Sequence, residues 1–357
     1  MTQDIRSVPL KKLHGEDFPS CRTVLLVTGR ASYEACGASR EIERIFAGCE
    51  IVRFSDFETN PRLEDLQKGL PLCRKADLIV AVGGGSVLDM AKLLKAFAAC
   101  DGNPEDFVTG RKKLESLSSL PLIAVPTTSG SGSESTHFAV VYVNKIKYSL
   151  AHPELLPSIV VLDPSLTLSM SAQQAAVSGL DALSQAVESW WSVNANPESR
   201  NFAEKSMALT LEHLIPSVQS GSLKNREGMQ RAANLAGQAI NISKTTGAHA
   251  FSYYLTSRFG IPHGYAAALM LIPFILYNSR GGRLEGLFPL LQAENAEEAA
   301  EKVSTIIRSC ALEPRLAQLI DVDAVFEDFL ASVNLERLQN NPRPLDNPEE
   351  FRALLLR

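Results

Sequence analysis

The sequence predicts an α/β domain built on a parallel sheet, followed by an all-α domain. Apolar, β-branched runs alternate with helical stretches in the first half, small-residue turns follow two of these runs, and long segments of helical periodicity fill the second half. A chain of 357 residues also exceeds the usual size of one hydrophobic core. We therefore expect an α/β domain over residues 1–168 and a helical domain over residues 169–357.

The strands of the first domain are expected where continuous apolar runs occur. Such strands bury side chains on both faces, which is typical of a parallel sheet covered by helices on both sides. Residues 137–151 predict a strand pair, and residues 158–164 predict a further strand. The four main runs are TVLLVTG (23–29), EIVRFSDF (50–57), ADLIVAVGGG (76–85) and LPLIAVPTT (120–128).

The second domain is expected to be a helical bundle. Its apolar residues recur at helical spacing, and β-branched runs become rare. The tail after NNPRPLDNP (340–348) predicts one short helix at the surface. No flexible linker separates the two halves, so we expect the domains to meet along a broad seam, where ligand sites are common. The predicted helical segments are 171–195, 198–220, 225–258 and 264–280.

Composition restricts the class of partner. A net charge of −5 and a pI near 5.8 give no electrostatic attraction to nucleic acid or to an anionic membrane, so a small-molecule ligand is expected. The N-terminus lacks the apolar core of a signal peptide, and no stretch has the uninterrupted length of a membrane span. The six cysteines show no paired spacing, which favours reduced thiols. These features predict a cytoplasmic protein.

A glycine-rich turn follows the third apolar run. In VGGGSVLDMAK a buried strand, the turn at 83–86 and an amphipathic helix follow one another. Backbone N–H groups and a helix N-terminus would face a phosphate there, although a tight turn without a ligand is the alternative. A second loop, PTTSGSGSES (126–135), follows the next strand at the same edge of the sheet, where ligands bind. Its alternative is a flexible surface loop.

Four residues of the helical half predict a metal site. Asp181 and Gln185 are four residues apart in a helical pattern and so share one face. His249 and His263 lie in a segment that is otherwise apolar or small. One carboxylate, one amide oxygen and two imidazoles suit Zn²⁺ or Fe²⁺, with a position left for substrate. Alternatively, the Asp–Gln pair is solvated and each histidine is a hydrogen-bonded core residue.

Residues 23–280 resemble the iron-containing (group III) alcohol dehydrogenase family, which is related in fold to dehydroquinate synthase and glycerol dehydrogenase. The resemblance implies a Rossmann-like sheet, one divalent metal ion and a nicotinamide cofactor, NADPH or NADH. The family's ligands, Asp, His, His and His, match Asp181, Gln185, His249 and His263, so Gln185 departs from the pattern by offering a neutral amide oxygen. The motifs that carry the resemblance are GGGSVLDMAK, PTTSGSGSE, GLDALSQAVES and HAFSYYLTSRFGIPHG.

The activity that this resemblance implies is the reduction of a small aldehyde to an alcohol. The metal polarises the carbonyl oxygen while the dihydronicotinamide supplies hydride. Gln185, together with KTTGAHAFSY and ESWWSVN, is similar to the branch that reduces phosphonoacetaldehyde to 2-hydroxyethylphosphonate in phosphonate biosynthesis. The alternatives are a maleylacetate, lactaldehyde or general alcohol dehydrogenase, a dehydroquinate synthase-like lyase, or a metal-free binding relative without catalysis. Family members are commonly dimers, so a homodimer is expected.

The resemblance also assigns cofactor contacts. The position of Gly29 is one where NAD-selective relatives often carry an aspartate, and the neighbouring Arg30 favours the 2′-phosphate of NADPH. Alternatively, Gly29 makes a turn and both cofactors serve. The implied contacts are Gly84, Gly85 and Ser86 for the pyrophosphate, Thr127 and Thr128 on the adenosine side, and Asn60 and Lys147 elsewhere on the cofactor.

Three further residues are candidates for proton transfer and substrate binding. Tyr253 lies four residues after His249, on the same helical face, and is the candidate proton relay, with a hydrogen-bonded core tyrosine as the alternative. Lys244 and Arg258 each precede one of the two histidines by five residues. A phosphonate needs positive hydrogen-bonding partners, so both cations are candidates to bind it. The alternative is that both are solvated surface residues.

Overall fold

The computed structural model describes residues 3–115, 117–144, 146–281, 284–333 and 335–357. The chain divides into two compact units. Unit 1 contains Met1–Thr128 and Gly132–Ser169, and unit 2 contains Ser129–Ser131 and Met170–Arg357. Within the described residues, we find no helix with both the length and the apolar character that crossing a membrane requires.

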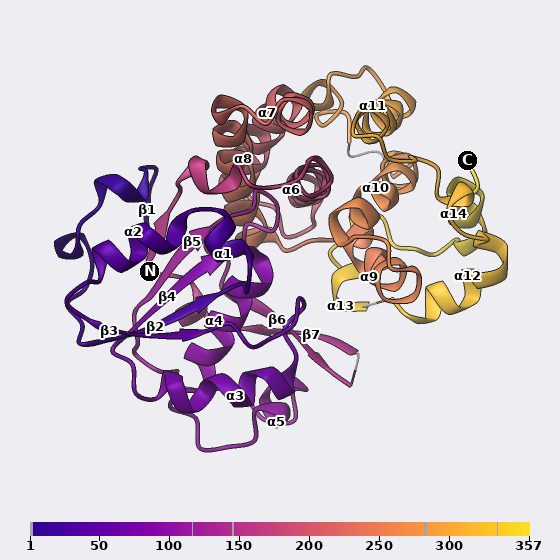
Figure 1. Cartoon of the computed structure of the whole chain (residues 1–357). Coiled ribbons are helices and arrows are strands. Elements are labelled where there is room, and N and C mark those ends of the chain that lie inside the picture. Colours follow the sequence, from indigo (N-terminus) through magenta and orange to yellow (C-terminus); the bar gives the residue numbers. More distant parts are fainter. Residues whose placement is uncertain (1–2, 116, 145, 282–283, 334) are drawn as a thin grey trace. The chain divides into compact units, whose positions relative to one another are not determined.

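Unit 1 is built on a six-stranded parallel sheet with the strand order β1-β8-β5-β4-β2-β3 (Figure 1). The four main predicted runs form β2 to β5, which confirms the predicted parallel α/β domain. The short strand β1 was not predicted, because three residues at the sheet edge, two of them charged, make no apolar run. The strands are β1 (Asp4–Arg6), β2 (Thr23–Thr28), β3 (Glu50–Phe54), β4 (Leu78–Gly83), β5 (Leu122–Pro126) and β8 (Ile159–Val161).

Helices cover both faces of this sheet, as continuous apolar strands require. Along β2, Leu25 packs in one core with Leu94 of α4, whereas Val24 packs in another core with Ile42 of α2. The antiparallel hairpin of β6 and β7 forms a separate two-stranded sheet. The remaining elements of unit 1 are α1 (Ser32–Ala35), α2 (Ala38–Ile45), α3 (Leu63–Cys73), α4 (Gly85–Phe97), α5 (Pro104–Val108), β6 (Phe138–Val143) and β7 (Ile146–Ala151).

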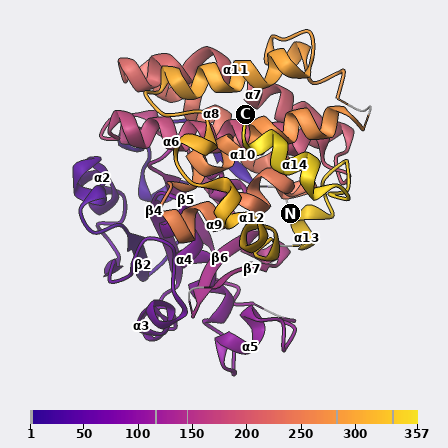
Figure 2. The same ribbon diagram turned by 90° about the vertical axis from the view of Figure 1, so that its right-hand side faces the viewer.

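The described part of unit 2 contains helices and connecting loops but no strand, which confirms the predicted all-α half. Its long helices α6, α7 and α8 run side by side (Figure 2). The helices are α6 (Ala172–Trp191), α7 (Pro197–Gln219), α8 (Leu223–Ser243), α9 (Gly247–Phe259), α10 (His263–Ser279), α11 (Ala296–Ser309), α12 (Val322–Ala331), α13 (Leu335–Leu338) and α14 (Pro348–Leu355).

One predicted helix is wrong, because residues 225–258 form two helices. The first, α8, ends at Ser243, and Lys244 then takes a φ of 60°, which no right-handed helix allows. The chain restarts as α9 at Gly247. Side-chain periodicity continues across the break, so the sequence pattern did not reveal a change that lies in one backbone dihedral.

The tail helix α14 is present, but it does not lie only on the surface as predicted. Phe351 is fully buried, and its ring centroid lies 5.2 Å from Phe251, 4.6 Å from Phe274 and 5.7 Å from Tyr277. These contacts join the C-terminal residues to the main core of unit 2. The last part of the chain therefore supports the helices that carry the two candidate histidine ligands.

Candidate functional site

Helix α6 presents three buried polar side chains on one face. Asp181, Gln185 and Glu188 are spaced by four and three residues, and their relative exposures are 7%, 4% and 0%. Most of their neighbours in the helix are alanine, leucine or other core residues. Burying this polar stripe is costly unless each member finds a partner.

Asp181, His249 and His263 come together at this face. One ligand atom from each of the three side chains lies within 4.8 Å of the others. His249 Nε2 lies 3.2 Å from Asp181 Oδ1, and the two imidazole rings are 5.3 Å apart between centroids. Two nitrogens and one carboxylate oxygen at this spacing form a donor set that suits Zn²⁺ or Fe²⁺.

A glycine next to His263 permits the close approach of α10 to α6. A Cβ atom on Gly264 would lie 2.1 Å from the carbonyl oxygen of Val177 and 2.7 Å from Cβ of Asp181. Any larger residue would push the two helices apart. The His-Gly pair at the start of α10 therefore places His263 beside Asp181.

Gln185 is the predicted fourth ligand, and only one of its two side-chain amide atoms is hydrogen-bonded within the described residues. Its Nε2 donates to the carbonyl oxygen of Ser131 at 3.2 Å. Its Oε1 is buried and has no hydrogen-bond partner among the described residues. A buried acceptor without a partner is costly, and a metal ion is one partner that takes such an oxygen. This leftover acceptor fits the presence of a metal ion at the cluster.

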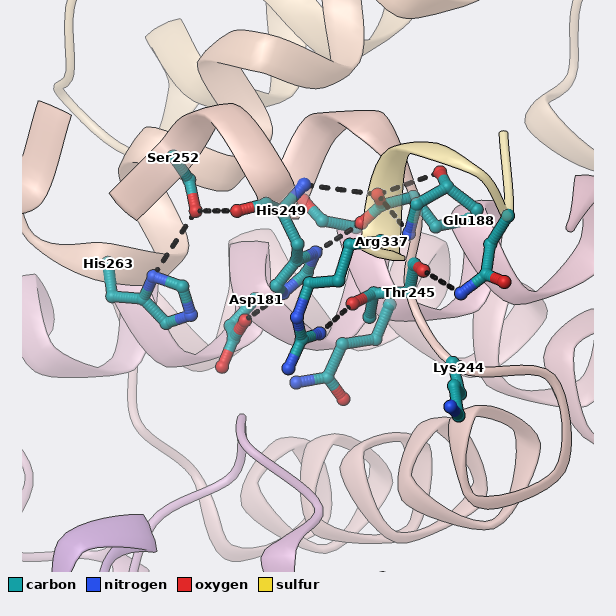
Figure 3. A network of polar contacts seen from close by, with 12 residues as sticks. Asp181, Glu188, Lys244, Thr245, His249, Ser252, His263 and Arg337 are labelled. Carbon is teal, nitrogen blue, oxygen red and sulfur yellow. Dashed lines mark hydrogen bonds and ion pairs between the residues drawn. The ribbon is translucent and has the colours of Figure 1, made fainter. Parts of the chain in front are cut away.

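Glu188 holds His249 in place (Figure 3). Its Oε2 contacts Nδ1 of His249, and its Oε1 accepts from the backbone N–H groups of Thr246 and His249 at 2.9 and 3.1 Å. The carboxylate therefore caps the N-terminus of α9 and orients the imidazole as well. Glu188 was not predicted as a site residue, although it lies on the same helical face as Asp181 and Gln185 and within the motif GLDALSQAVES.

The electrostatics of this pair follow from burial and charge. Burial alone lowers the pKa of His249, but the negative charge of Glu188 and the hydrogen bond to Asp181 outweigh it and raise that pKa to about 9. For Glu188 the signs are reversed. Burial raises its pKa, but the positive charge of His249 and the hydrogen bonds to it more than offset burial, so the pKa of Glu188 is lowered. A metal ion binds neutral imidazole, so it must displace a proton from His249.

The second histidine is held by α9. Ser252 donates to the carbonyl oxygen of His249 at 2.8 Å, and its Oγ lies 3.4 Å from Nδ1 of His263. The ring of Tyr253 stacks on His263 with a centroid distance of 5.4 Å and an angle of 20°. The candidate proton relay therefore lies against a candidate ligand, and its role stays a prediction.

An arginine that the sequence analysis missed also contacts these residues. Arg337 of α13 donates from Nη1 to Oγ1 of Thr245, and its guanidinium lies 5.4 Å from the centroid of the Tyr253 ring. It lies outside the range covered by the resemblance. No periodicity or motif in the sequence connects it to the histidines.

The two predicted substrate cations, Lys244 and Arg258, are both exposed. Lys244 follows the end of α8, and in the view of Figure 3 Thr245 lies between it and Asp181. Arg258 occupies the last turn of α9, whereas His249 lies in the first turn of that helix. Their binding of a substrate stays a prediction.

In unit 1, the predicted cofactor residues gather at the carboxyl ends of β4 and β5. The backbone N–H of Asn60 donates to Ser86 Oγ at 3.1 Å, and that of Thr127 donates to the carbonyl oxygen of Gly83 at 3.0 Å. A Cβ atom on Gly84 would lie 3.1 Å from Thr128, so a glycine keeps this turn open. Helix α4 begins at Gly85. The turn thus presents a helix N-terminus and little side-chain bulk, which fits a pyrophosphate.

Lys147 and Gly29 lie at other parts of unit 1. Lys147 pairs with Tyr142 across the hairpin, and the Tyr142 N–H donates to the carbonyl oxygen of Pro61 at 2.8 Å, so the hairpin adjoins the Asn60 segment. Gly29 directly follows β2, and a Cβ atom there would lie 2.2 Å from Ser32 Oγ. A side chain at position 29 would require only that the Ser32 hydroxyl rotate away, so the structure gives no strict steric requirement for glycine in this turn.

Two family models match most of the chain. The model described as iron-containing alcohol dehydrogenase matches residues 11–164. The model described as Fe-containing alcohol dehydrogenase family, C-terminal, matches residues 175–355. Together they cover both the glycine-rich turn and the histidine cluster.

Individual relatives agree with the family models. Phosphonoacetaldehyde reductase from Streptomyces viridochromogenes is 33% identical over 78% of this chain and 76% of its own. Long-chain-alcohol dehydrogenase 1 from Geobacillus thermodenitrificans is 38% identical over 64% of this chain, and the match spans 59% of that relative's length. The crystal structure of sulfoacetaldehyde reductase from Bifidobacterium kashiwanohense in complex with NAD⁺ superposes with a TM-score of 0.90 at 26% identity, covering 99% of this chain and 96% of the other. The chain therefore belongs to the iron-containing alcohol dehydrogenase family and is an oxidoreductase.

Proposed function

We propose that this protein is a metal-dependent, NAD(P)H-linked reductase of a small aldehyde that carries an anionic group, and that phosphonoacetaldehyde is its substrate. The product would be 2-hydroxyethylphosphonate. The observation that carries this proposal is the cluster of Asp181, His249 and His263, the first two of them buried, together with the unpartnered amide oxygen of Gln185 on the same helix as Asp181. Burying polar atoms together is costly when one of them lacks a partner, and a metal ion would supply that partner.

In this proposal, the side chains of the cluster hold a metal ion and orient one another for aldehyde reduction. A divalent ion, when bound, polarises the carbonyl oxygen of the aldehyde and so favours hydride transfer to the carbonyl carbon. Asp181, Gln185, His249 and His263 would hold that ion. Glu188 keeps Nδ1 of His249 engaged and thereby turns Nε2 toward Asp181. We further propose that Tyr253, stacked on His263, relays the proton that the product alcohol needs.

The cofactor is proposed to bind at the turn after β4. The open turn at Gly84, the Asn60–Ser86 contact and the start of α4 support a bound pyrophosphate. The NAD⁺ complex of the sulfoacetaldehyde reductase neighbour supports a nicotinamide cofactor. We favour NADPH because β2 is followed by glycine and arginine rather than by a carboxylate that would repel a 2′-phosphate.

Two similarities support an anionic substrate. One relative is named for phosphonoacetaldehyde and one structural neighbour for sulfoacetaldehyde, and both compounds carry an oxyanion one carbon from the aldehyde. The metal is Fe²⁺ or Zn²⁺ in this proposal, because both accept a mixed set of nitrogen and oxygen ligands. We also propose that the protein is a homodimer in the cytoplasm. Light scattering would measure its oligomeric state.

A metal-reconstitution assay tests the proposed function. The chelated protein should not oxidise NADPH or NADH with any aldehyde, and one equivalent of Fe²⁺ or Zn²⁺ should restore reduction of phosphonoacetaldehyde. If the metal-loaded protein reduces no aldehyde in a broad panel, it is a binding relative without catalysis. If it reduces only uncharged aldehydes, the reductase activity stands and the phosphonate assignment is wrong.

A further inference from the structure

A short helix near the C-terminus brings a cation to the candidate metal site. Arg337 belongs to α13 (Leu335–Leu338) and is half-buried, unlike the exposed Lys244 and Arg258. In the view of Figure 3, its guanidinium lies between Thr245 and Asp181. A charge that is partly shielded from water interacts more strongly with a bound anion than an exposed one does.

Contacts connect Arg337 to both candidate histidine ligands. On one side, its guanidinium lies over the Tyr253 ring, which in turn stacks on His263, with 5.4 Å for each of the two steps. On the other side, Nη1 donates to Thr245, whose neighbour Thr246 donates to the Glu188 carboxylate that holds His249. Arg337 therefore lies within two contacts of His263 and is linked through Thr245 and Thr246 to the carboxylate that holds His249.

Buried asparagines fix the segment that follows α13. Asn340 donates to the carbonyl oxygen of Thr245 at 3.2 Å and accepts from Asn194 at 2.6 Å. Asn341 exchanges two side-chain hydrogen bonds with Asn278, at 2.7 and 3.2 Å. These bonds hold the chain next to Arg337 before any ligand arrives, which lowers the entropy lost on binding.

We propose that Arg337 binds the anionic head group of the substrate and selects aldehydes that carry a tetrahedral oxyanion close to the carbonyl carbon. This inference rests on the proposed function and names the residue that gives it its substrate class. A guanidinium has five N–H donors in one plane, so it holds a protein oxygen and a phosphonate or sulfonate at once. The same charge disfavours a cationic alcohol such as choline.

Three aldehydes of similar shape test the inference on the metal-loaded enzyme. Phosphonoacetaldehyde and sulfoacetaldehyde carry the oxyanion with different charge, and 3,3-dimethylbutanal replaces it with an uncharged tert-butyl group. Arg337→Met should lower kcat/KM for both oxyanion aldehydes by about 10- to 100-fold, mainly through KM, and change the uncharged aldehyde by less than about threefold. Arg337→Lys should lose less, and added guanidinium ion should restore part of the Arg337→Met loss.

Arg352→Met is the matched control, because Arg352 also lies over an aromatic ring, at 5.5 Å from Phe326, and pairs with Asp323. It should leave all three aldehydes unchanged. Equal losses on the three aldehydes in Arg337→Met, with bound metal or melting temperature reduced, would show that Arg337 only supports the fold and would overturn the inference. Full activity of Arg337→Met on both oxyanion aldehydes would also overturn it. Failure of the unmodified enzyme on both oxyanion aldehydes, with the uncharged one reduced, would refute the proposed substrate class itself.

Discussion

One group of buried or half-buried charged side chains in each unit can be compared, and the two groups differ in how completely their polar atoms are paired. In unit 1, the ammonium of Lys92 is fully buried and donates to Ser133, Thr136 and the carbonyl oxygen of Phe138, each at 2.9 Å. In unit 2, the group contains Asp181, Glu188, His249 and His263. Gln185, on the same helix as Asp181 and Glu188, keeps an amide oxygen that has no hydrogen-bond partner among the described residues. We call the first group closed, because each donor of its ammonium has an acceptor. We call the second group open, because a buried hydrogen-bond acceptor next to it in the same helix has no partner among the described residues.

The closed group fits a structural role. An ammonium has three donors, and Lys92 has an acceptor for each. Asp89 accepts from Ser133 at 2.5 Å and from the backbone N–H of Val140 at 3.1 Å. These bonds fasten α4 to the 133–136 segment and to β6 within unit 1. The comparison teaches that pairing, rather than burial of charge alone, separates a structural group from a candidate ligand site.

The largest effect is expected from removing a ligand of the open group. His263→Ala should reduce bound metal from one ion per chain to near zero and lower aldehyde reduction by at least about a hundredfold. Metal analysis and NADPH oxidation would measure both.

His213→Ala is the matched control for the ligand variant. His213 is also buried and contacts Asn225 at 3.2 Å, but it lies in α7. It should keep its metal. Unchanged metal content in His263→Ala would remove the basis for calling the open group a metal site.

The next effect concerns the closed group and should appear in stability. Lys92→Met leaves Asp89 partly buried without its cation, which should lower the free energy of unfolding by about 3 kcal/mol. Denaturant unfolding would measure this loss, and the metal content of the variant should stay at that of the unmodified protein. Loss of metal in this variant would show that the two groups are not independent.

The same variant makes a pH-dependent prediction with a definite sign. Burial lowers the pKa of Lys92 from 10.5 to about 8, so between these values the unfolded chain binds more protons than the folded chain. Stability attributable to Lys92 therefore rises with pH across this window and falls as pH drops toward 8. The gap in unfolding free energy between the unmodified protein and Lys92→Met should widen from pH 8 to pH 10. A constant gap would mean that Lys92 keeps an ordinary pKa.

A smaller effect is expected from Glu188→Gln, which keeps the shape of the side chain and removes its charge. The variant still accepts hydrogen bonds at the start of α9, but it no longer stabilises the orientation of His249 by charge. Metal affinity should fall by about 10- to 100-fold, measured by competition with a chelator. Undiminished affinity would reduce the role of Glu188 to capping α9.

The sequence indicates the candidate site of unit 1 more directly than the candidate site of unit 2. The turn at 83–86 is contiguous, so one motif contains the strand end, the glycines and the helix start. The cluster of unit 2 takes its residues from three helices, α6, α9 and α10. Asp181, His249 and His263 were predicted as a set because their residue types suit a metal.

Two residues of unit 2, Glu188 and Arg337, were not predicted. Their contacts arise from how separate segments pack together, which the residue types alone do not indicate. Glu188 matters because the break at Lys244 directs the N-terminus of α9 onto it, and that break lies in one backbone dihedral. Arg337 contacts Thr245 and Tyr253, and a buried asparagine, Asn340, holds the segment that follows it to Thr245. Neither fact has a periodic signature in the sequence.

The smallest effect is expected from replacing Arg30, an exposed charge of unit 1. This variant tests whether a solvent-facing residue outside the closed group affects the choice between NADPH and NADH. Arg30 pairs with Asp56 at 3.1 Å and with Glu58 at 3.7 Å, and its side chain is 60% exposed. These carboxylates and the solvent offset part of its attraction for a 2′-phosphate. Arg30→Ala should therefore raise KM for NADPH by about three- to tenfold, less so at high salt, and leave KM for NADH unchanged. A strong preference for NADH that Arg30→Ala does not alter would contradict the proposed NADPH selectivity and would leave Gly29 as a residue that only makes the turn after β2.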